Sequence, residues 1–409
     1  MKILVVYPYL VDQSVAGHSV MYETLLGLSA MGHQITVVSG EGGYMQGPAA
    51  ARRPWWRRLV WTEQMGPMRV LRTLSYRGHQ RGMAGRLLSY ALLSLLNPVA
   101  VLLAGRQDVA LLSPPPLYPI FTSLLACLLR RLPAVTEVRD LWPGSIVQMG
   151  LMRNRWLIAL TAWMERFTYN HSRQIVALTE GIRDDVVGRG WPADRAHTLA
   201  CAVDTRCLRP DPQWRAEVRA RHHWEAQWVA LYFGALGEAN NLPVMLRVAQ
   251  RLQGTPGIRI ALAGDGFRRD WLMGEVERLG LKNLEVLPAV PKGQAAGYLN
   301  AADASLVTLQ DLQVFEGAIP TKLVESLACG RPVLCGVRGE AARMVTRSGA
   351  GLCFAPDDDA ALAEAMLMLK SNPESALAMG TAGRSYAQQY FDSAGRAQRM
   401  AGLLKQAAG

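Results

Sequence analysis

The chain has 409 residues, of which 50% are hydrophobic and 19% are charged. This balance is ordinary for a globular protein and too apolar for a disordered one, and the length suggests two or three domains. The six cysteines (127, 201, 207, 329, 335 and 353) form no C-x-x-C pair. That spacing argues against a disulfide framework or a zinc site and favours a reducing compartment.

The N-terminal sequence MKILVVYPYLVDQ is predicted to form the first strand of a sheet. It has one lysine and an apolar run before Asp12, with no small-residue cleavage site after it. A secretory signal would need such a site. We therefore expect a cytoplasmic protein, or one on the cytosolic side of a membrane.

The next segment is strongly basic. Residues 51–86 contain nine arginines and one acid, Glu63, for a net charge of +8 against +11 for the whole chain. Trp55, Trp56 and Trp61 lie in the same segment, and residues 87–105 then read LLSYALLSLLNPVAVLLAG, without a charged residue. Residues 51–106 therefore form a basic, tryptophan-bearing insert that continues into an apolar helix.

Several interpretations of this insert compete. Its apolar part is just long enough to span a bilayer, but Asn97 and Pro98 would place an amide and a kink in the middle of the span. Nucleic acid would explain the arginines but not the tryptophans, and a buried core helix stays open. The combination best suits an anionic membrane surface. We expect a peripheral location on the inner face of the cytoplasmic membrane, and no nucleic-acid partner.

Strand-like apolar runs alternate with helical segments along the chain. A first set lies at residues 2–7, 35–39, 109–113, 134–138 and 174–179, and a second set lies at 228–234, 258–264, 284–290, 304–309, 332–336 and 351–355. Such runs indicate parallel sheets with helices on both faces. The pattern predicts an α/β protein with two doubly wound Rossmann-like domains, residues 1–205 and 206–390, and an interdomain cleft for the ligand. Residues 391–409 are predicted to form a C-terminal helix that returns to the first domain.

Glycine-rich turns follow several of these strands. Gly17 precedes a helix, Gly234 and Gly237 lie in FGALGEANNL, and Gly264 opens AGDGF. None of these turns completes a dinucleotide fingerprint or a P-loop. The histidines and serines form no metal-ligand or nucleophile pattern, and the acidic run 357–359 is expected to cap a helix.

The stretch EGAIPTKLVESLACGRPVL, residues 316–334, is predicted to contain a short helix that starts after Pro320 and ends before Gly330. Its apolar residues recur at helical spacing, but Lys322 and Glu325 also lie on it. Glu325 does not fit a capping box, because the position three residues after Thr321 is Val324. A surface ion pair between Lys322 and Glu325 is the structural alternative to a ligand-binding function.

Four segments together resemble the GT-B glycosyltransferases, in particular glycosyltransferase family 4 and its bacterial cell-surface polysaccharide subgroup. They are TEVRDLWPGSIVQMG (136–150), IVALTEGIRDDVVGRGWP (175–192), FGALGEANNL and the 316–334 stretch. The likeness extends over nearly the whole chain apart from the arginine- and tryptophan-rich segment. It implies a GT-B fold and transfer of a sugar from a nucleotide-diphosphate sugar, with a UDP-sugar favoured.

The resemblance also implies positions for the donor. Glu325 would accept hydrogen bonds from the ribose hydroxyls, and Lys322 would hold the diphosphate together with backbone N–H groups at the helix start. Pro320, Thr321 and Leu323 at that helix start would also contact the donor. Gly17, Gly234, Gly237 and Gly264 would let the backbone approach the phosphates, and the base would lie at Val290. Three departures affect these assignments: Glu316 and Glu325 are separated by eight residues, not seven, the usual Arg and Lys of the glycine turn are replaced by Glu238 and Asn240, and Cys201-Ala202 stands where Asn-Gly is usual.

For the reaction, the family likeness implies retention of configuration, no metal and no cofactor. Asp140, with Glu137, Arg139 and Glu316, would orient the donor sugar or the acceptor, although a buried ion-pair network is the alternative for the first three. The acceptor would be a lipid-linked or glycan substrate on an anionic membrane surface. Two other functions stay open: a sugar-nucleotide epimerase on the same fold, and a catalytically silent membrane-bound partner of an assembly complex.

Overall fold

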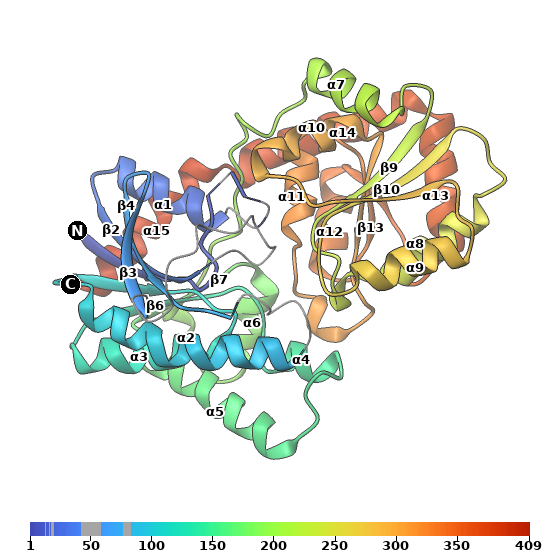
Figure 1. The fold of residues 1–409 in the computed structure, drawn as a ribbon. Helices are drawn as coiled ribbons and strands as arrows, with labels where there is room; N and C mark the ends of the chain where they lie inside the picture. The colour runs from blue at the N-terminus through green and yellow to red at the C-terminus, as the bar shows by residue number, and fades with distance from the viewer. Residues whose placement is uncertain (13, 16, 18–19, 42–58, 77–82) are drawn as a thin grey trace. The chain divides into compact units, whose positions relative to one another are not determined.

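The computed structural model describes residues 1–12, 14–15, 17, 20–41, 59–76 and 83–409. The chain forms two compact units (Figure 1): Met1–Cys201 together with Ser393–Gly409, and Ala202–Asp392. The chain passes from the first unit to the second after Cys201, close to the domain boundary at residue 205 that the sequence predicts. Residues 51–58 and 77–82 of the predicted basic insert lie outside the described residues, and they include Trp55, Trp56 and six of the nine arginines of the 51–86 segment.

The first unit contains an eight-stranded sheet with the order β3-β4-β2-β1-β5-β6-β7-β8, in which only the β3–β4 pair is antiparallel. The strands are β1 (Lys2–Val6), β2 (Gln34–Gly40), β3 (Val60–Met65), β4 (Met68–Thr73), β5 (Val109–Leu112), β6 (Ala134–Val138), β7 (Gln174–Ala177) and β8 (Ala196–Thr198). All five strands expected from the sequence are present in this sheet. The strands β3, β4 and β8 were not expected.

The helices of this unit are α1 (Val20–Ala30), α2 (Met83–Leu103), α3 (Leu117–Leu129), α4 (Gly144–Gln148), α5 (Arg155–Asn170), α6 (Glu180–Gly188) and α15 (Ser393–Ala408), with a 3-10 turn, η2 (Ala193–Arg195). Alternate residues of β1 show how the sheet is covered. Ile3 and Val5 pack in one cluster with residues of α1 and α15, whereas Leu4 and Val6 pack in another with residues of α2 and α3. Because successive side chains of a strand point to opposite faces, both faces of this sheet are buried.

The hairpin β3–β4 corrects part of the sequence interpretation. It joins the edge of the sheet, where β4 pairs in parallel with β2. Arg72, one of the nine arginines of residues 51–86, is 7% exposed, pairs with Glu63 and donates to the backbone carbonyls of Leu10 and Gly40. This arginine therefore holds the sheet edge and is not available to a membrane.

The helix α2 continues through Pro98. Asn97 is fully buried and accepts a hydrogen bond of 2.8 Å from Thr73 Oγ1, so the amide faces the protein. By length and composition alone, Gly85–Leu103 could cross a membrane, and 28% of this window is buried within the structure. α2 packs along α3, and α3 packs along α5 (Figure 1).

Large apolar side chains are exposed along these three helices. The exposed fraction reaches 70% at Leu95, 76% at Leu129 and 71% at Trp156. We call this set the apolar helix face: Leu87, Leu88, Leu95, Val99, Leu102 and Leu103 of α2, Leu125, Leu128 and Leu129 of α3, and Trp156, Leu157, Leu160 and Trp163 of α5.

The second unit contains a six-stranded, all-parallel sheet with the order β11-β10-β9-β12-β13-β14. Its strands are β9 (Trp228–Phe233), β10 (Ile258–Ala263), β11 (Leu284–Leu287), β12 (Ala304–Thr308), β13 (Val333–Gly336) and β14 (Gly351–Cys353). All six match the second set expected from the sequence. The strand order reverses between β9 and β12, which is where doubly wound sheets bind ligands.

The helices of this unit are α7 (Pro212–His222), α8 (Leu242–Arg251), α9 (Arg269–Arg278), α10 (Ala295–Ala301), α11 (Thr321–Ala328), α12 (Glu340–Ser348), α13 (Asp359–Ser371) and α14 (Pro373–Tyr390), with 3-10 turns η3 (Glu238–Asn240), η4 (Lys292–Gln294) and η5 (Gln313–Phe315). Leucines and other apolar residues of α8, α9 and α13 pack on one face of the sheet. α11 packs against α14. As expected, Asp358 caps α13, because its side chain accepts from Ala361 N.

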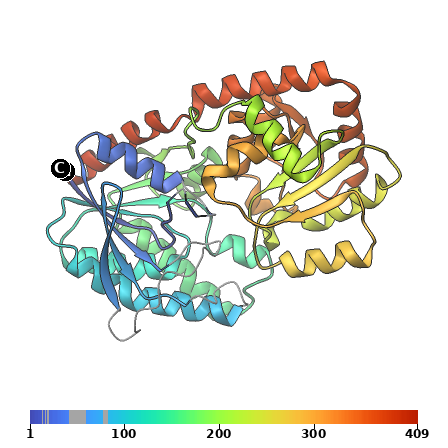
Figure 2. The same ribbon diagram turned by 45° about the horizontal axis from the view of Figure 1, so that its top comes forward.

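The C-terminal helix α15 lies in the first unit. Figures 1 and 2 both show it (red) beside α1 (blue), and Gly27 of α1 leaves no room for a larger side chain opposite Ala397. Arg396 is 2% exposed and donates to the backbone carbonyls of Leu199 and Ala200 and to Glu137. The last residues of the chain therefore complete the core of the first unit.

Candidate functional site

The helix α11 has the bounds that the sequence predicts. Pro320 precedes it with extended backbone geometry, and Gly330 follows it with φ of 64°. Leu323, Val324 and Leu327 are fully buried, which accounts for its apolar face. The first turn starts without a side-chain cap. N–H groups at such a helix start that are not already bonded within the chain are suited to bind an anion.

Lys322 and Glu325 do not form the surface ion pair that was the alternative interpretation. Glu325 is 6% exposed and forms an ion pair with Lys292, which lies in η4 directly after the Val290-Pro291 turn. The turn expected to hold the base and the carboxylate expected to hold the ribose are thus brought together. Sequence reasoning missed Lys292; its only local signal is its position beside that turn.

Lys322 points to the glycine turn that follows β9. Its ammonium donates to Tyr232 Oη and to Asn240 Oδ1, the latter over 2.8 Å, and lies 3.8 Å from the centroid of the Tyr232 ring. Burial lowers the pKa of Lys322 to about 7, and the negative charge of Glu325 partly opposes this effect. A diphosphate at this point would restore the charge of the lysine and replace the two neutral acceptors with a stronger one.

Two of the predicted glycines are required by the geometry of this turn. Gly234 has φ of 149°, and a Cβ there would lie 3.4 Å from Lys322 Cε. A Cβ on Gly264 would lie 1.8 Å from the carbonyl oxygen of Gly234. Gly264 therefore lets the turns after β9 and β10 pack together, a different reason from the expected approach to phosphate. Gly237 has ordinary backbone geometry and lines a cavity described below.

The other donor residues of the second unit divide into two groups. The first group is partly exposed and lies close in sequence to Lys322 or Lys292: Pro320, Thr321 and Val290. Leu323 differs, because its side chain is fully buried and its N–H already donates to Pro320 O. Leu323 is therefore a core residue, which corrects its assignment as a donor contact. Glu316 has an exposed side chain, and its carbonyl oxygen accepts from Glu340 N over 2.7 Å.

In the first unit, Glu137 belongs to a buried network. It is fully buried near the end of β6, accepts from Ser113 Oγ over 2.7 Å and pairs with Arg396 of α15. The side chain of Arg139 is 7% exposed; it lies 3.6 Å from the Glu137 carboxylate and over the ring of Tyr7. Both residues thus have the buried ion-pair role that was the alternative to a catalytic one.

The other two predicted residues of the first unit, Asp140 and Gly17, lie at the ends of secondary-structure elements. Asp140 follows β6 and is exposed. Gly17 precedes α1 and has φ of 150°. Among the described residues, no group of three or more His, Cys, Asp or Glu side chains could hold a metal ion.

Comparisons with solved structures identify the fold. Sucrose-phosphate synthase from Thermosynechococcus elongatus superimposes with a TM-score of 0.74 at 16% identity, over 99% of this chain and 98% of that one. The Anabaena protein Alr3699/HepE, solved with UDP and glucose, gives the same TM-score and identity over 99% of both chains. These likenesses show that the two Rossmann-like units form the GT-B fold of glycosyltransferases.

Sequence comparisons identify the family. The model for glycosyl transferases group 1 matches residues 215–386, and that for the glycosyl transferase 4-like domain matches residues 17–202. The chain belongs to glycosyltransferase family 4. It is 27% identical over 219 residues to the GDP-mannose-dependent α-(1-6)-phosphatidylinositol monomannoside mannosyltransferase of Mycolicibacterium smegmatis, a match that spans 52% of this chain and 57% of that protein.

Proposed function

We propose that this protein is a retaining, metal-independent glycosyltransferase that takes a sugar from a nucleotide-diphosphate sugar. The observation that carries the proposal is the set of charged residues on and beside α11: Lys322 lies against the Gly234 turn, and Glu325 is paired with Lys292. In this proposal the Lys322 ammonium binds the diphosphate, the buried Glu325 carboxylate accepts from the ribose hydroxyls, and Lys292 lies beside the turn that holds the base. The membership of the chain in a glycosyltransferase family supports the same function.

The donor base stays open between two expectations. We favour a UDP-sugar, as expected from the sequence, and the solved complex of Alr3699/HepE contains UDP. The mannosyltransferase relative is named for GDP-mannose. A thermal-shift panel with UDP, GDP, TDP and CMP separates these possibilities.

Binding at about 100 times Kd adds about 2.7 kcal/mol to the free energy of unfolding. For a unit of about 200 residues, this corresponds to a shift of roughly 5 to 10 °C. We expect one diphosphate to give this shift, and Glu325→Gln to abolish it. Glu364→Gln changes an exposed glutamate of α13 and serves as the matched control. Absence of a shift with all four nucleotides would contradict the proposal.

The acceptor is proposed to be lipid-linked or a glycan in cell-surface polysaccharide assembly, reached from the inner face of the cytoplasmic membrane. The apolar helix face supports this, because it exposes two tryptophans and many leucines on adjacent helices. Exposed arginines lie at the ends of these helices: Arg106 after α2, Arg131 after α3, and Arg153 and Arg155 at the start of α5. Apolar side chains flanked by cations fit an anionic bilayer interface.

Vesicle flotation tests the membrane part separately from the donor part. We expect the wild-type protein to float with phosphatidylglycerol-containing vesicles, and Trp156→Ala/Trp163→Ala to reduce binding at least tenfold without changing nucleotide affinity. The matched control is Leu377→Ala, which removes an apolar side chain that is 73% exposed on α14 of the other unit. Equal flotation of the tryptophan variant and the wild type would contradict this role of the apolar helix face.

Turnover tests the reaction itself. Incubation with the donor identified above and a lipid-linked acceptor should yield a product with the anomeric configuration of the donor, in the presence of EDTA as in its absence. Loss of turnover in EDTA, or inversion seen by NMR of the product, would contradict the metal-independent retaining mechanism. Conversion of the nucleotide sugar into its epimer without an acceptor would favour the epimerase alternative.

A further inference from the structure

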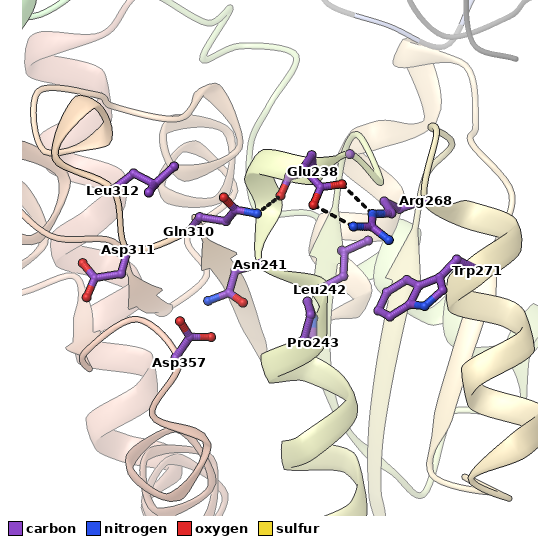
Figure 3. A pocket seen from close by; sticks show the side chains of 11 residues that line it. Glu238, Asn241, Leu242, Pro243, Arg268, Trp271, Gln310, Asp311, Leu312 and Asp357 are labelled. Carbon is purple, nitrogen blue, oxygen red and sulfur yellow. Dashed lines mark hydrogen bonds and ion pairs between the residues drawn. The ribbon is translucent and has the colours of Figure 1, made fainter. Parts of the chain in front are cut away.

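A cavity of about 350 Å³ lies in the second unit. It is built at the carboxyl ends of the strands, from the turns that follow β9, β10, β12 and β14 and from the first turns of α8 and α9 (Figure 3). This is the edge of the sheet at which doubly wound folds bind ligands. Its size is that of a small-ligand pocket.

One polar group in this cavity has no partner within the described part of the chain. Asn241 is 4% exposed, and its Nδ2 makes no hydrogen bond there. Figure 3 shows the amide in the middle of the cavity, between Leu242 and the side that carries Asp311 and Asp357. A buried amide donor without a partner is costly, and a ligand acceptor would remove that cost.

The backbone keeps Asn241 in this position at some strain. It lies in the left-handed region, with φ of 47° and ψ of 52°, at the start of α8. Its neighbour Asn240 points to Lys322 and binds it, whereas Asn241 lines the cavity. Adjacent residues of one turn thus contribute to two different sites, Asn240 to the proposed donor site and Asn241 to the cavity.

The walls of the cavity combine an aromatic surface with hydrogen-bond acceptors. Trp271, with Leu242 and Pro243, provides the apolar side, and Arg268 lies 5.1 Å from the Trp271 ring while holding Glu238 through two hydrogen bonds. Asp311 and Asp357 lie across from them (Figure 3). An aromatic ring facing a few fixed polar groups is the usual composition of a specific ligand pocket.

The charges limit the class of ligand. Three carboxylates and one guanidinium line the cavity, so a nucleotide diphosphate would meet like charge there. Asp311 is already paired with Arg338, and Asp357 with Arg247, so neither carboxylate requires a cationic ligand. A carboxylate paired in this way keeps lone pairs that can still accept from hydroxyl groups.

We propose that this cavity is a binding site for a neutral saccharide, separate from the donor site. A sugar ring would place its apolar face on Trp271, accept a hydrogen bond from Asn241 Nδ2 and donate hydroxyl protons to Asp311 and Asp357. Sugar hydroxyls both donate and accept, which matches a wall made of an amide donor and carboxylate acceptors. The proposal does not depend on which nucleotide sugar the protein uses.

Saturation-transfer NMR with methyl α-D-mannopyranoside, methyl α-D-glucopyranoside, methyl β-D-galactopyranoside and N-acetylglucosamine tests it on the full chain. We expect at least one of these sugars to bind the wild type and to lose at least tenfold in affinity with Trp271→Ala and with Asn241→Gly. Glycine accepts the left-handed backbone, so the second variant removes the amide without adding strain. Trp214→Ala, a partly buried tryptophan of α7 outside the cavity, is the matched control.

Two further measurements decide whether the site is distinct. Saturating UDP should leave the saccharide signal unchanged, and Glu325→Gln, which impairs the proposed donor site, should retain it. Displacement by UDP would assign the cavity to the donor site and overturn the proposal. Absence of binding for all four sugars, or equal binding by the wild type and both cavity variants, would also overturn it.

Discussion

The ammonium of Lys322 lies against the Tyr232 ring, and its pKa is lowered to about 7 from an ordinary value of 10.5 by burial. Only the charged form attracts a diphosphate. Because bound phosphate would raise this pKa again, nucleotide affinity should fall as the pH rises above 7, by up to about tenfold per unit. Calorimetric titration of the diphosphate between pH 7 and pH 9, in two buffers with different ionisation enthalpies, should show this decline together with proton uptake on binding.

The same shift has the opposite sign for the stability of the free protein. Between pH 7 and pH 10.5 the unfolded chain holds the Lys322 proton and the folded chain does not. The lysine therefore destabilises the fold at neutral pH, and its unfavourable contribution diminishes as the pH rises. We expect Lys322→Met to raise the melting temperature by a few degrees and to abolish nucleotide binding. Unchanged binding by this variant would remove Lys322 from the donor site.

The Lys292–Glu325 pair should behave as one buried unit. The two side chains are 10% and 8% exposed. Removing one partner leaves the other charge buried without compensation, at a cost of about 3–5 kcal/mol, whereas removing both costs much less. We expect Lys292→Met and Glu325→Gln each to lower the free energy of unfolding more than the double variant does, as measured by urea titration. Additive effects in this double-mutant cycle would contradict the pairing.

At the scale of elements, Arg396 of α15 forms a buried ion pair with Glu137, near the end of β6. This pair joins α15 to the rest of the first unit. Arg396→Met should therefore lower the stability of that unit by about 3–5 kcal/mol, and Glu137→Gln should also lower it. Exposed Arg399 of the same helix gives the control variant Arg399→Met. If Glu137→Gln lowered turnover but left stability unchanged, Glu137 would be catalytic as first expected, and the structural role would be wrong.

How far the elements follow from the sequence depends on how each strand is buried. The two sets of central strands, such as residues 2–7 and 228–234, are covered on both faces and read as continuous apolar runs, so they were predicted. The edge hairpin β3–β4 was missed because Arg69, Arg72 and Glu63 interrupt its apolar pattern. Burial of Arg72 depends on backbone carbonyls far along the chain, which no local pattern shows.

The candidate site was predictable only where one short stretch carries it. The 316–334 stretch indicated its helix, Lys322 and Glu325 from local spacing and family likeness. Lys292 was missed because its partner lies 33 residues further along the chain. The cavity around Asn241 joins four turns, and no local pattern brings Trp271 and Asp357 together.

At the scale of the whole molecule, the formal net charge of +11 and the apolar helix face should act together on an anionic bilayer. Each basic residue near the surface contributes about 1 kcal/mol, and salt weakens this contribution by shortening the Debye length to about 3 Å at 1 M. Burial of tryptophan and leucine side chains does not depend on salt in this way. Flotation on phosphatidylglycerol vesicles should therefore fall several-fold between 0.1 and 0.5 M NaCl but persist at the higher value. The Trp156→Ala/Trp163→Ala variant should bind only at the lower salt, and retention of its binding at 0.5 M NaCl would show that the two tryptophans do not enter the bilayer.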